Sequence, residues 1–142
     1  MERVYTAPLL DKLGVRPGMR VAIVGSLHDD HDESAGFRES LAERTSDLTE
    51  SNRPKPDTDI VFLAADTTRE LRALARIRPR LRPTGAVWVV SRKGRAATLR
   101  DVEVMAAARD HDLVDNKVVA FSASRTAVRL VIPVALRRGD RG

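Results

Sequence analysis

The chain has 142 residues, a net charge of +5 and no cysteine. This length fits one domain, so we expect a single domain over 1–142 with its ordered core at about 7–135, and the lack of cysteine excludes disulfides, thiolate catalysis and cysteine-ligated zinc. The sequence has no apolar signal segment and no run long enough to span a membrane, which predicts a cytoplasmic protein that does not contact membranes.

The first two predicted elements are a short helix and a buried strand. Three leucines share one helical face directly before Gly14, a residue type common at helix C-termini: Leu9, Leu10 and Leu13. After a turn at Pro17-Gly18, the β-branched apolar run at 20–24 predicts a strand buried on both faces. Gly25 follows this strand directly.

The sequence pattern weakens between Ser26 and Asp57. Phe37, Leu41 and Ala42 predict one short helix, and the prolines at 54 and 56 predict a loop because proline has no backbone N–H. We interpret this region as too short and irregular to hold the strand–helix–strand unit that usually follows the first strand of a nucleotide-binding sheet.

From residue 60 onward, strands and helices alternate. Continuous apolar runs predict buried strands at 60–64 and 86–90. Residues 67–70 have the capping-box pattern, so a helix should begin there and break near Pro79. Its core-facing stripe is expected to consist of Leu71, Leu74, Ile77 and Leu81.

The last predicted elements are one more helix and a pair of strands. The helix opens at 98–101, and its apolar residues are Leu99, Val102, Met105 and Ala106. Two apolar runs, Val118 to Phe121 and Val128 to Val134, are joined by a short polar turn. This spacing predicts an antiparallel hairpin, and we expect it to be buried on both faces.

This order of elements predicts an α/β fold, a three-layer Rossmann-like domain with a mostly parallel open sheet and a C-terminal antiparallel hairpin. With the phrases "LGVRPGMRVAIVG", "DIVFLAAD" and "LRPTGAVWVV", it resembles a shortened class I S-adenosylmethionine-dependent methyltransferase. The resemblance implies an acidic residue two positions before a Gly-x-Gly-x-Gly loop. It also implies an acidic residue at the end of the second strand, which holds the ribose hydroxyls.

The glycine loop of that family is incomplete in this chain. Ile23 stands at the acidic position, Leu27 and Asp29 stand at the last two glycine positions, and only Gly25 remains. Glycine lets the backbone approach a ligand closely, so we expect the side chains of Leu27 and Asp29 to obstruct the cofactor. We therefore expect that S-adenosylmethionine does not bind and that the protein has no resident cofactor.

The chain also resembles a bacterial family catalogued as domain of unknown function 3052, over about Ala7 to Val134. The shared phrases are "PLLDKLGVRPGMRVA", "GAVWVVSRKG" and "LVDNKVVAFSASRTAVRLV". This chain departs from the family pattern at Arg92, where the family has proline, and at Arg125, where it has tryptophan. The resemblance implies the methyltransferase-like fold and no particular activity.

Ligands of open α/β sheets bind beyond the carboxyl ends of the strands, where the strand order reverses. This rule selects the residues that follow the predicted parallel strands: Gly25, Ser26, His28, Asp66, Ser91, Arg92 and Lys93. The two cations Arg92 and Lys93 are the best candidates, because they suit a phosphate or carboxylate. In the alternative interpretation, Gly25 only permits a tight turn and Asp66 only lies beside a helix cap.

The run "HDDHDE" contains imidazole and carboxylate groups of the kind that bind divalent metals: His28, Asp30, His31 and Asp32. Metal sites usually take their ligands from separate elements and support them with further hydrogen bonds. We therefore interpret the run as an acidic loop and expect no metal site.

Charge is unevenly distributed along the chain. Residues 1–66 hold 8 Lys and Arg against 13 Asp and Glu, whereas residues 67–142 hold 17 against 7. The second part includes four arginines with helical spacing, here called the Arg face: Arg69, Arg72, Arg76 and Arg80. They form either a footprint for nucleic acid or an acidic protein, or a solvated face, which we favour. No aromatic residues accompany them, which argues against nucleic acid as a partner.

The sequence contains no serine elbow and no phosphate-binding loop, so we favour a function without catalysis. Our preferred hypothesis is a non-catalytic methyltransferase-like domain that binds a protein partner or an anionic small ligand. One alternative is a divergent transferase that holds an adenosyl or nucleotide cofactor by backbone contacts. A third hypothesis is a nucleic-acid accessory protein that uses the Arg face.

Overall fold

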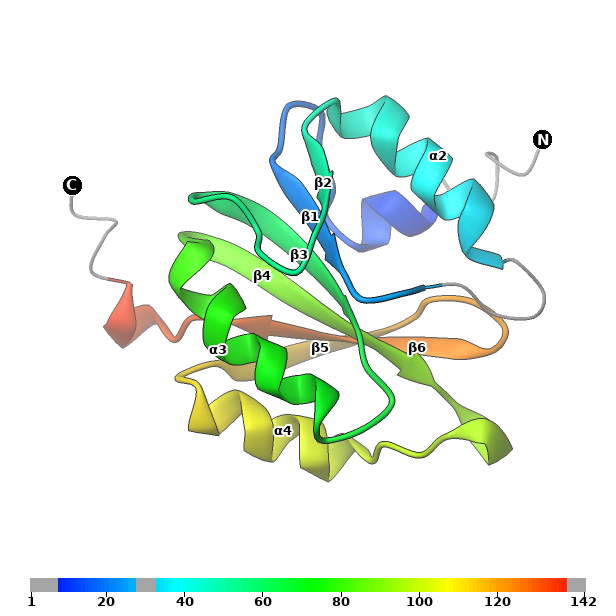
Figure 1. Cartoon of the computed structure of the whole chain (residues 1–142), viewed down its shortest axis with the longest axis vertical. Coiled ribbons are helices and arrows are strands. Elements are labelled where there is room, and N and C mark those ends of the chain that lie inside the picture. The colour runs from blue at the N-terminus through cyan, green and yellow to red at the C-terminus, as the bar shows by residue number, and fades with distance from the viewer. Residues whose placement is uncertain (1–7, 28–32, 138–142) are drawn as a thin grey trace.

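The computed structural model describes residues 8–27 and 33–137. Within these residues the chain forms one six-stranded sheet with the order β2-β1-β3-β4-β6-β5, and helices cover both of its faces (Figure 1). The strands are β1 (Val21–Val24), β2 (Leu48–Glu50), β3 (Thr58–Ala64), β4 (Leu81–Arg92), β5 (Val114–Ala120) and β6 (Arg125–Val131).

Strands β2, β1, β3 and β4 are parallel to one another, whereas β6 is antiparallel to both β4 and β5. The predicted three-layer α/β fold, mostly parallel with a C-terminal antiparallel hairpin, is therefore confirmed.

The helices lie in two layers. Residues 8–12 are helical, as predicted, and together with α2 (Glu33–Thr45) they cover one face of the sheet. The other face carries α3 (Leu74–Ile77) and α4 (Asp101–Asp110). One 3₁₀ turn directly precedes α3 and another directly follows it. Among the described residues, no helix has both the length and the apolar character needed to cross a membrane.

The core consists of two apolar layers, one on each side of the sheet. Side chains alternate along a strand, so neighbouring residues of β3 point to opposite layers. Val61 packs with the α3 residues Leu74 and Ile77, whereas Phe62 packs with Leu10 and other residues of the second layer. The indole N–H of Trp88 in this second layer donates a 3.0 Å hydrogen bond to the carbonyl of Leu13, which links β4 to the N-terminal helix.

The interpretation of residues 26–57 as too short for a second unit is wrong. This region holds the 13-residue helix α2 and the strand β2, which pairs with β1 in parallel. The buried side chains of Phe37 and Leu41 fix the helix on the sheet, while Ala42 is exposed. Because β2 has only three residues and none is fully buried, it leaves no recognisable apolar pattern.

The capping box at residues 67–70 forms only in part. The amide of Glu70 donates to Oγ1 of Thr67 at 3.1 Å, but the Glu70 carboxylate accepts from the Asp66 amide and the Thr67 hydroxyl, and the 3₁₀ turn begins at Glu70. The helix that follows is shorter than predicted, since α3 has four residues and a 3₁₀ turn at 78–80 contains Pro79. Leu81 adopts an extended conformation and begins β4, so its assignment to the helical stripe is wrong. The other stripe residues are buried as expected: Leu71, Leu74 and Ile77.

The predicted apolar stripe of α4 is also partly wrong. The helix begins at Asp101, so Leu99 is buried in the segment before it rather than in its first turn. Val104 and Ala108 are the buried residues of the helix, while Val102 is 61% exposed and Ala106 is exposed. Val104 and Ala108 lie four residues apart and form the face that packs on the sheet, so the face expected from Val102 and Ala106 points outward.

The hairpin forms as predicted, but only one of its strands is buried. Strand β6 lies between β4 and β5, whereas β5 forms the sheet edge and its Val118 is 62% exposed. The register of the pair shifts between Asp115 and Lys117. The expectation of a hairpin buried on both faces is thus wrong for β5. The apolar run predicts that Val134 belongs to the second strand, but Val134 lies in a short 3₁₀ turn.

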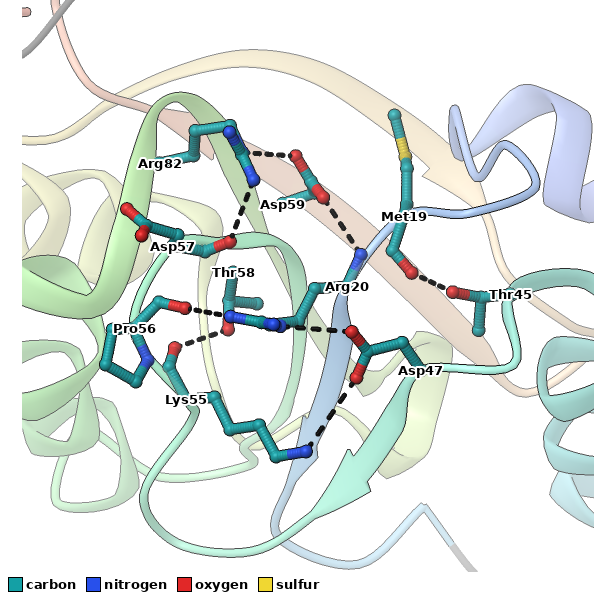
Figure 2. A network of polar contacts seen from close by, with 10 residues as sticks. All are labelled: Met19, Arg20, Thr45, Asp47, Lys55, Pro56, Asp57, Thr58, Asp59 and Arg82. Atoms are coloured by element: carbon teal, nitrogen blue, oxygen red, sulfur yellow. Dashed lines mark hydrogen bonds and ion pairs between the residues drawn. The ribbon is translucent and has the colours of Figure 1, made fainter.

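A network of polar contacts joins the amino ends of the parallel strands (Figure 2). The Arg20 side chain donates to Oδ2 of Asp47 at 3.1 Å and to the carbonyl of Pro56 at 2.6 Å, and its amide donates to Asp59 at 2.9 Å. Asp59 also pairs with Arg82 at 2.9 Å. One guanidinium therefore holds the turn before β2 and the loop before β3 in place.

The position of β6 predicts its hydrogen exchange. Amides of β6 should exchange near the limit set by global unfolding, because both neighbouring strands cover them. Amides of β5 that point away from β6 should exchange by local fraying and therefore much faster. Native-state hydrogen exchange measures both sets, and equal rates would contradict the assignment of β5 to the edge.

The Arg20 network predicts a stability effect. Arg20→Met keeps the aliphatic stem and removes both side-chain hydrogen bonds, so the free energy of unfolding should fall by about 1–2 kcal/mol. Arg16→Met is the control, since Arg16 is exposed and its described hydrogen bonds involve only its backbone amide and carbonyl. The control should change stability by less than about 0.5 kcal/mol in urea unfolding, and equal effects would show that the network contributes nothing.

Candidate functional site

The strand order reverses at β1, whose neighbours are β2 on one side and β3 on the other. The loops after β1 and β3 therefore leave the carboxyl edge of the sheet in opposite directions, the geometry that forms ligand crevices in open α/β sheets. The register places Val24 beside Leu63 and Ala64 beside Val90. Most residues selected from the sequence thus lie along this carboxyl edge: Gly25, Ser26, Asp66, Ser91, Arg92 and Lys93.

The backbone conformation at position 25 requires a glycine. Its φ is +88°, a conformation that side chains disfavour, and a Cβ atom there would lie 3.0 Å from the carbonyl oxygen of Ala64. The glycine lets the loop after β1 pass close to the end of β3. The tight-turn interpretation of Gly25 therefore has a direct structural basis, and Ser26 beside it is exposed.

Asp66 fastens the ends of β3 and β4 together. Its Oδ1 accepts a 2.8 Å hydrogen bond from the amide of Arg92, and its carbonyl accepts one of 2.6 Å from the hydroxyl of Thr98. Its own amide donates to the carboxylate of Glu70 at 2.8 Å. The carboxylate is therefore engaged in the structure of this edge, which supports the structural interpretation of Asp66.

Two arginines stand opposite each other at the same edge. Arg92 ends β4 and Arg125 begins β6, and their Cα atoms are direct register partners. Both point to the face that carries α2, because Val90 and Ala127, two residues away along each strand, belong to the core layer on that face. Arg125 is only 3% exposed, whereas the Arg92 side chain is about half exposed and its Nε lies 4.0 Å from Asp66.

Ser91 and Lys93 are the residues on either side of Arg92 in the chain. Lys93 follows Arg92 directly, and its amide donates to the carbonyl of Ser124 at 3.0 Å, which joins the end of β4 to the hairpin turn. Ser91 is buried and lies on the opposite face, with Val89. The structure therefore brings the Arg92 and Arg125 side chains together on one face. Ser91 and, by the same alternation, the extended residue Lys93 direct their side chains to the other face.

The sequence analysis missed Arg125 as a site residue, although it noted the position as a departure from a family pattern. An arginine after a polar turn usually indicates an exposed position, and nothing local to it signals burial. Only its register with Arg92 identifies it as part of the carboxyl edge.

Two further observations bear on cofactor binding. Leu27 is buried in the same core layer as Phe37, so the expectation that its side chain obstructs the crevice is wrong. Glu50 ends β2 beside Ile23 and forms a 3.0 Å ion pair with Arg38. The sequence analysis missed this carboxylate, which stands where the methyltransferase resemblance implies the ribose-binding acid.

The proposed metal ligands His28, Asp30, His31 and Asp32 lie outside the described residues, as does Asp29. Across residues 8–27 and 33–137, no three His, Asp or Glu side chains gather in a way that could hold a metal ion.

The Arg face does not form one regular basic surface. Its residues lie on a chain segment that alternates between 3₁₀ and α geometry, and Arg76 donates to the carbonyl of Asn52 at 2.9 Å. A hollow of about 300 Å³ separates this segment from α4, with walls of mixed charge: Thr68, Leu71, Arg72, Glu103, Ala106, Ala107, Asp110 and His111. The acidic residues of this hollow disfavour a nucleic-acid backbone there.

No family model matches the chain, so the resemblance to the domain of unknown function 3052 stays an expectation. No curated protein matches either.

Solved structures of methyltransferases share the fold. A SAM-dependent methyltransferase from Aquifex aeolicus aligns with a TM-score of 0.56 and 15% identity over 89% of each chain. One from Leishmania major has a TM-score of 0.62 and 8% identity over 91% of this chain and 72% of its own. Magnesium protoporphyrin IX methyltransferase from Synechocystis has a TM-score of 0.55 and 12% identity over 92% and 77%. At these identities the likeness establishes the methyltransferase-like fold.

Gly25 predicts a measurable cost of substitution. Gly25→Ala should lower the free energy of unfolding by about 1–3 kcal/mol, because it adds both the unfavourable φ and the contact with Ala64. Gly94→Ala is a matched control, since Gly94 has a φ of +70° and open space around its missing Cβ. In chemical denaturation the Gly25 variant should be the less stable of the two. Equal losses would mean that the loop after β1 does not approach β3 closely.

Proposed function

We propose that this chain is a non-catalytic domain of methyltransferase-like fold that binds an anionic small ligand at the carboxyl edge of its sheet. The ligand class is a phosphate or carboxylate compound. The observation that carries the proposal is the facing pair of Arg92 and Arg125 on β4 and β6, with Lys93 next to it.

The electrostatics of this edge support an anion. Like charges directly opposite each other on neighbouring strands are unfavourable, and an anion between them offsets that repulsion. Asp66 lies at the edge of ion-pair distance from Arg92, at 4.0 Å, and already accepts the Arg92 amide. A phosphate or carboxylate between the arginines would accept charge-assisted hydrogen bonds from both of them.

The same edge offers little for catalysis. His111, the one histidine among the described residues, follows α4 and therefore lies at the opposite edge of the sheet. Ser91 is buried on the face away from the arginine pair. Within the described residues, this edge thus lacks the pairing of a nucleophile with a histidine base that group transfer commonly uses.

A second candidate function rests on Glu50. A carboxylate at the end of β2 can accept hydrogen bonds from ribose hydroxyls, and Leu27 leaves the crevice free because its side chain lies in the core. These observations favour a divergent transferase that binds an adenosyl or nucleotide cofactor. Among the proteins of similar fold, the Aquifex aeolicus and Leishmania major methyltransferases are SAM-dependent, and the Synechocystis enzyme has SAM bound. In this chain, the buried Ile23 provides no carboxylate at the end of β1.

Calorimetry with inorganic pyrophosphate tests the first proposal. Pyrophosphate should bind, and Arg92→Gln should weaken the affinity by about tenfold or more, because a charge-assisted hydrogen bond contributes about 1.5–3 kcal/mol. Arg95→Gln is the matched control, since Arg95 is exposed two residues beyond Lys93. The proposal fails if pyrophosphate does not bind or if both variants weaken it equally.

Titration with adenosine distinguishes the two candidate functions, because adenosine has ribose hydroxyls but no anionic group. The first proposal predicts no heat on adenosine titration. The second predicts binding that Glu50→Gln weakens and Arg92→Gln leaves unchanged. Binding of adenosine with this dependence on Glu50 would replace the first proposal by the second.

A further inference from the structure

A second group of cations lies on the outer part of the sheet, away from the Arg92–Arg125 pair. Lys117 of β5 and Arg129 of β6 are direct register partners, so both side chains stand on the same face. Arg137 follows the 3₁₀ turn after β6, and its Nε donates to the carbonyl of Ile132 at 2.8 Å. Burial, together with the nearby charge of Arg137, lowers the pKa of Arg129.

The contacts of these cations are with neutral oxygens. Arg129 donates to the amide oxygen of Asn116 at 3.5 Å, and Lys117 donates to the carbonyl of Lys12 at 3.4 Å. None of the three cations forms an ion pair within residues 8–27 and 33–137. The described structure thus brings three positive charges together without a carboxylate to balance them, which favours an anionic partner.

Exposed apolar side chains adjoin these cations. Val114 pairs with Val131, which lies on the same face of β6 as Arg129. Val134, which is 76% exposed, and Leu136 follow β6 directly. We call this surface the hairpin patch, and it consists of Val114, Lys117, Arg129, Val134, Leu136 and Arg137.

We propose that the hairpin patch is a docking surface for an acidic, amphipathic segment of a partner protein. Carboxylates of the segment would pair with the cations, and its apolar side chains would cover Val114, Val134 and Leu136. The apolar residues favour a protein over a nucleic-acid backbone, whose phosphates need cations and offer no apolar contact. This surface is separate from the carboxyl edge, so the proposal stands independently of the small-ligand site.

The geometry of β5 favours side-chain docking over addition of a strand to the sheet. An edge strand can pair with an extended peptide, but a bulge interrupts the regular spacing of backbone groups. The register of β5 shifts between Asp115 and Lys117, in the middle of the strand. A helical segment that uses side chains therefore fits this surface better than an added strand.

Nuclear magnetic resonance titration of the full chain tests the proposal with a defined probe. The probe is a short amphipathic helical peptide of Glu, Leu and Ala, and its control has Gln in place of Glu. At low salt the acidic peptide should shift the amide signals of 114–118, 127–131 and 134–137, while the Gln peptide should not. Shifts confined to other residues, or no saturable shift, would overturn the proposal.

Matched variants test the charges. Lys117→Gln with Arg129→Gln should weaken peptide binding by about fivefold or more, since each exposed ion pair contributes up to about 1 kcal/mol. Arg69→Gln with Arg72→Gln removes the same charge from the Arg face and should leave the affinity unchanged. Equal weakening by both pairs would show that the peptide responds only to net charge, and the proposal would fail.

A third variant tests the same surface with a substitution that should leave the fold intact. Val134→Asp changes a largely exposed side chain, so the fold should persist, and its added carboxylate should repel the acidic peptide and weaken binding by about fivefold or more. Unchanged affinity in this variant would contradict the hairpin patch. Duplex DNA serves as a competitor: tighter binding of DNA than of the peptide at the same residues would replace the protein partner by nucleic acid.

Discussion

The burial of three neighbouring parallel strands on both faces is the constraint on which the rest of the structure depends. β1, residues 60–64 of β3 and residues 86–90 of β4 consist of apolar residues that are removed from solvent. Such strands are stable only when helices cover both sides of the sheet. Trp88 makes the requirement specific, because its indole N–H inside the core finds its acceptor in the carbonyl of Leu13. The N-terminal helical segment is thereby part of the core.

Because helices cover both faces of the sheet, its charged side chains lie mainly at the ends of the strands and on the outer strands. The amino edge uses its charged residues for structure, since Arg20 and Asp59 are engaged with several loops at once (Figure 2). At the carboxyl edge, Asp66 has the same fastening role, but Arg92 beside it faces a second cation, Arg125, across the β4–β6 pair. This asymmetry directs the functional proposal to the carboxyl edge.

The sequence predicted best where side chains are buried on both sides. The apolar runs at 20–24, 60–64 and 86–90 correspond to β1, β3 and the central part of β4, and one of the two expected capping contacts at 67–70 forms. These features depend on local composition alone. Gly25 was selected because it directly follows such a run, and its positive φ supports the alternative interpretation, a tight turn.

The errors arise where position in the sheet or helix phase decides burial. Val118 and Val128 have the same side-chain type, but β5 has a neighbour on one side and β6 on both. Val102 points outward because α4 packs on the sheet through Val104 and Ala108, which lie on another face of the helix. Arg125 and Glu50 are candidate site residues because strand pairing places them beside Arg92 and Ile23, respectively. These partners are far away along the chain. No pattern within a short window contains that information.

The central claim is that this methyltransferase-like fold holds an anion at its carboxyl edge in place of S-adenosylmethionine. Titration of S-adenosylmethionine into the full chain by isothermal calorimetry tests it most directly. Besides its single carboxylate, that cofactor has a sulfonium and an ammonium group and is therefore net positive, so the cations of this edge should repel it, and Ile23 supplies no carboxylate at the end of β1. The account predicts no binding heat at millimolar cofactor. Saturable binding of S-adenosylmethionine would contradict it.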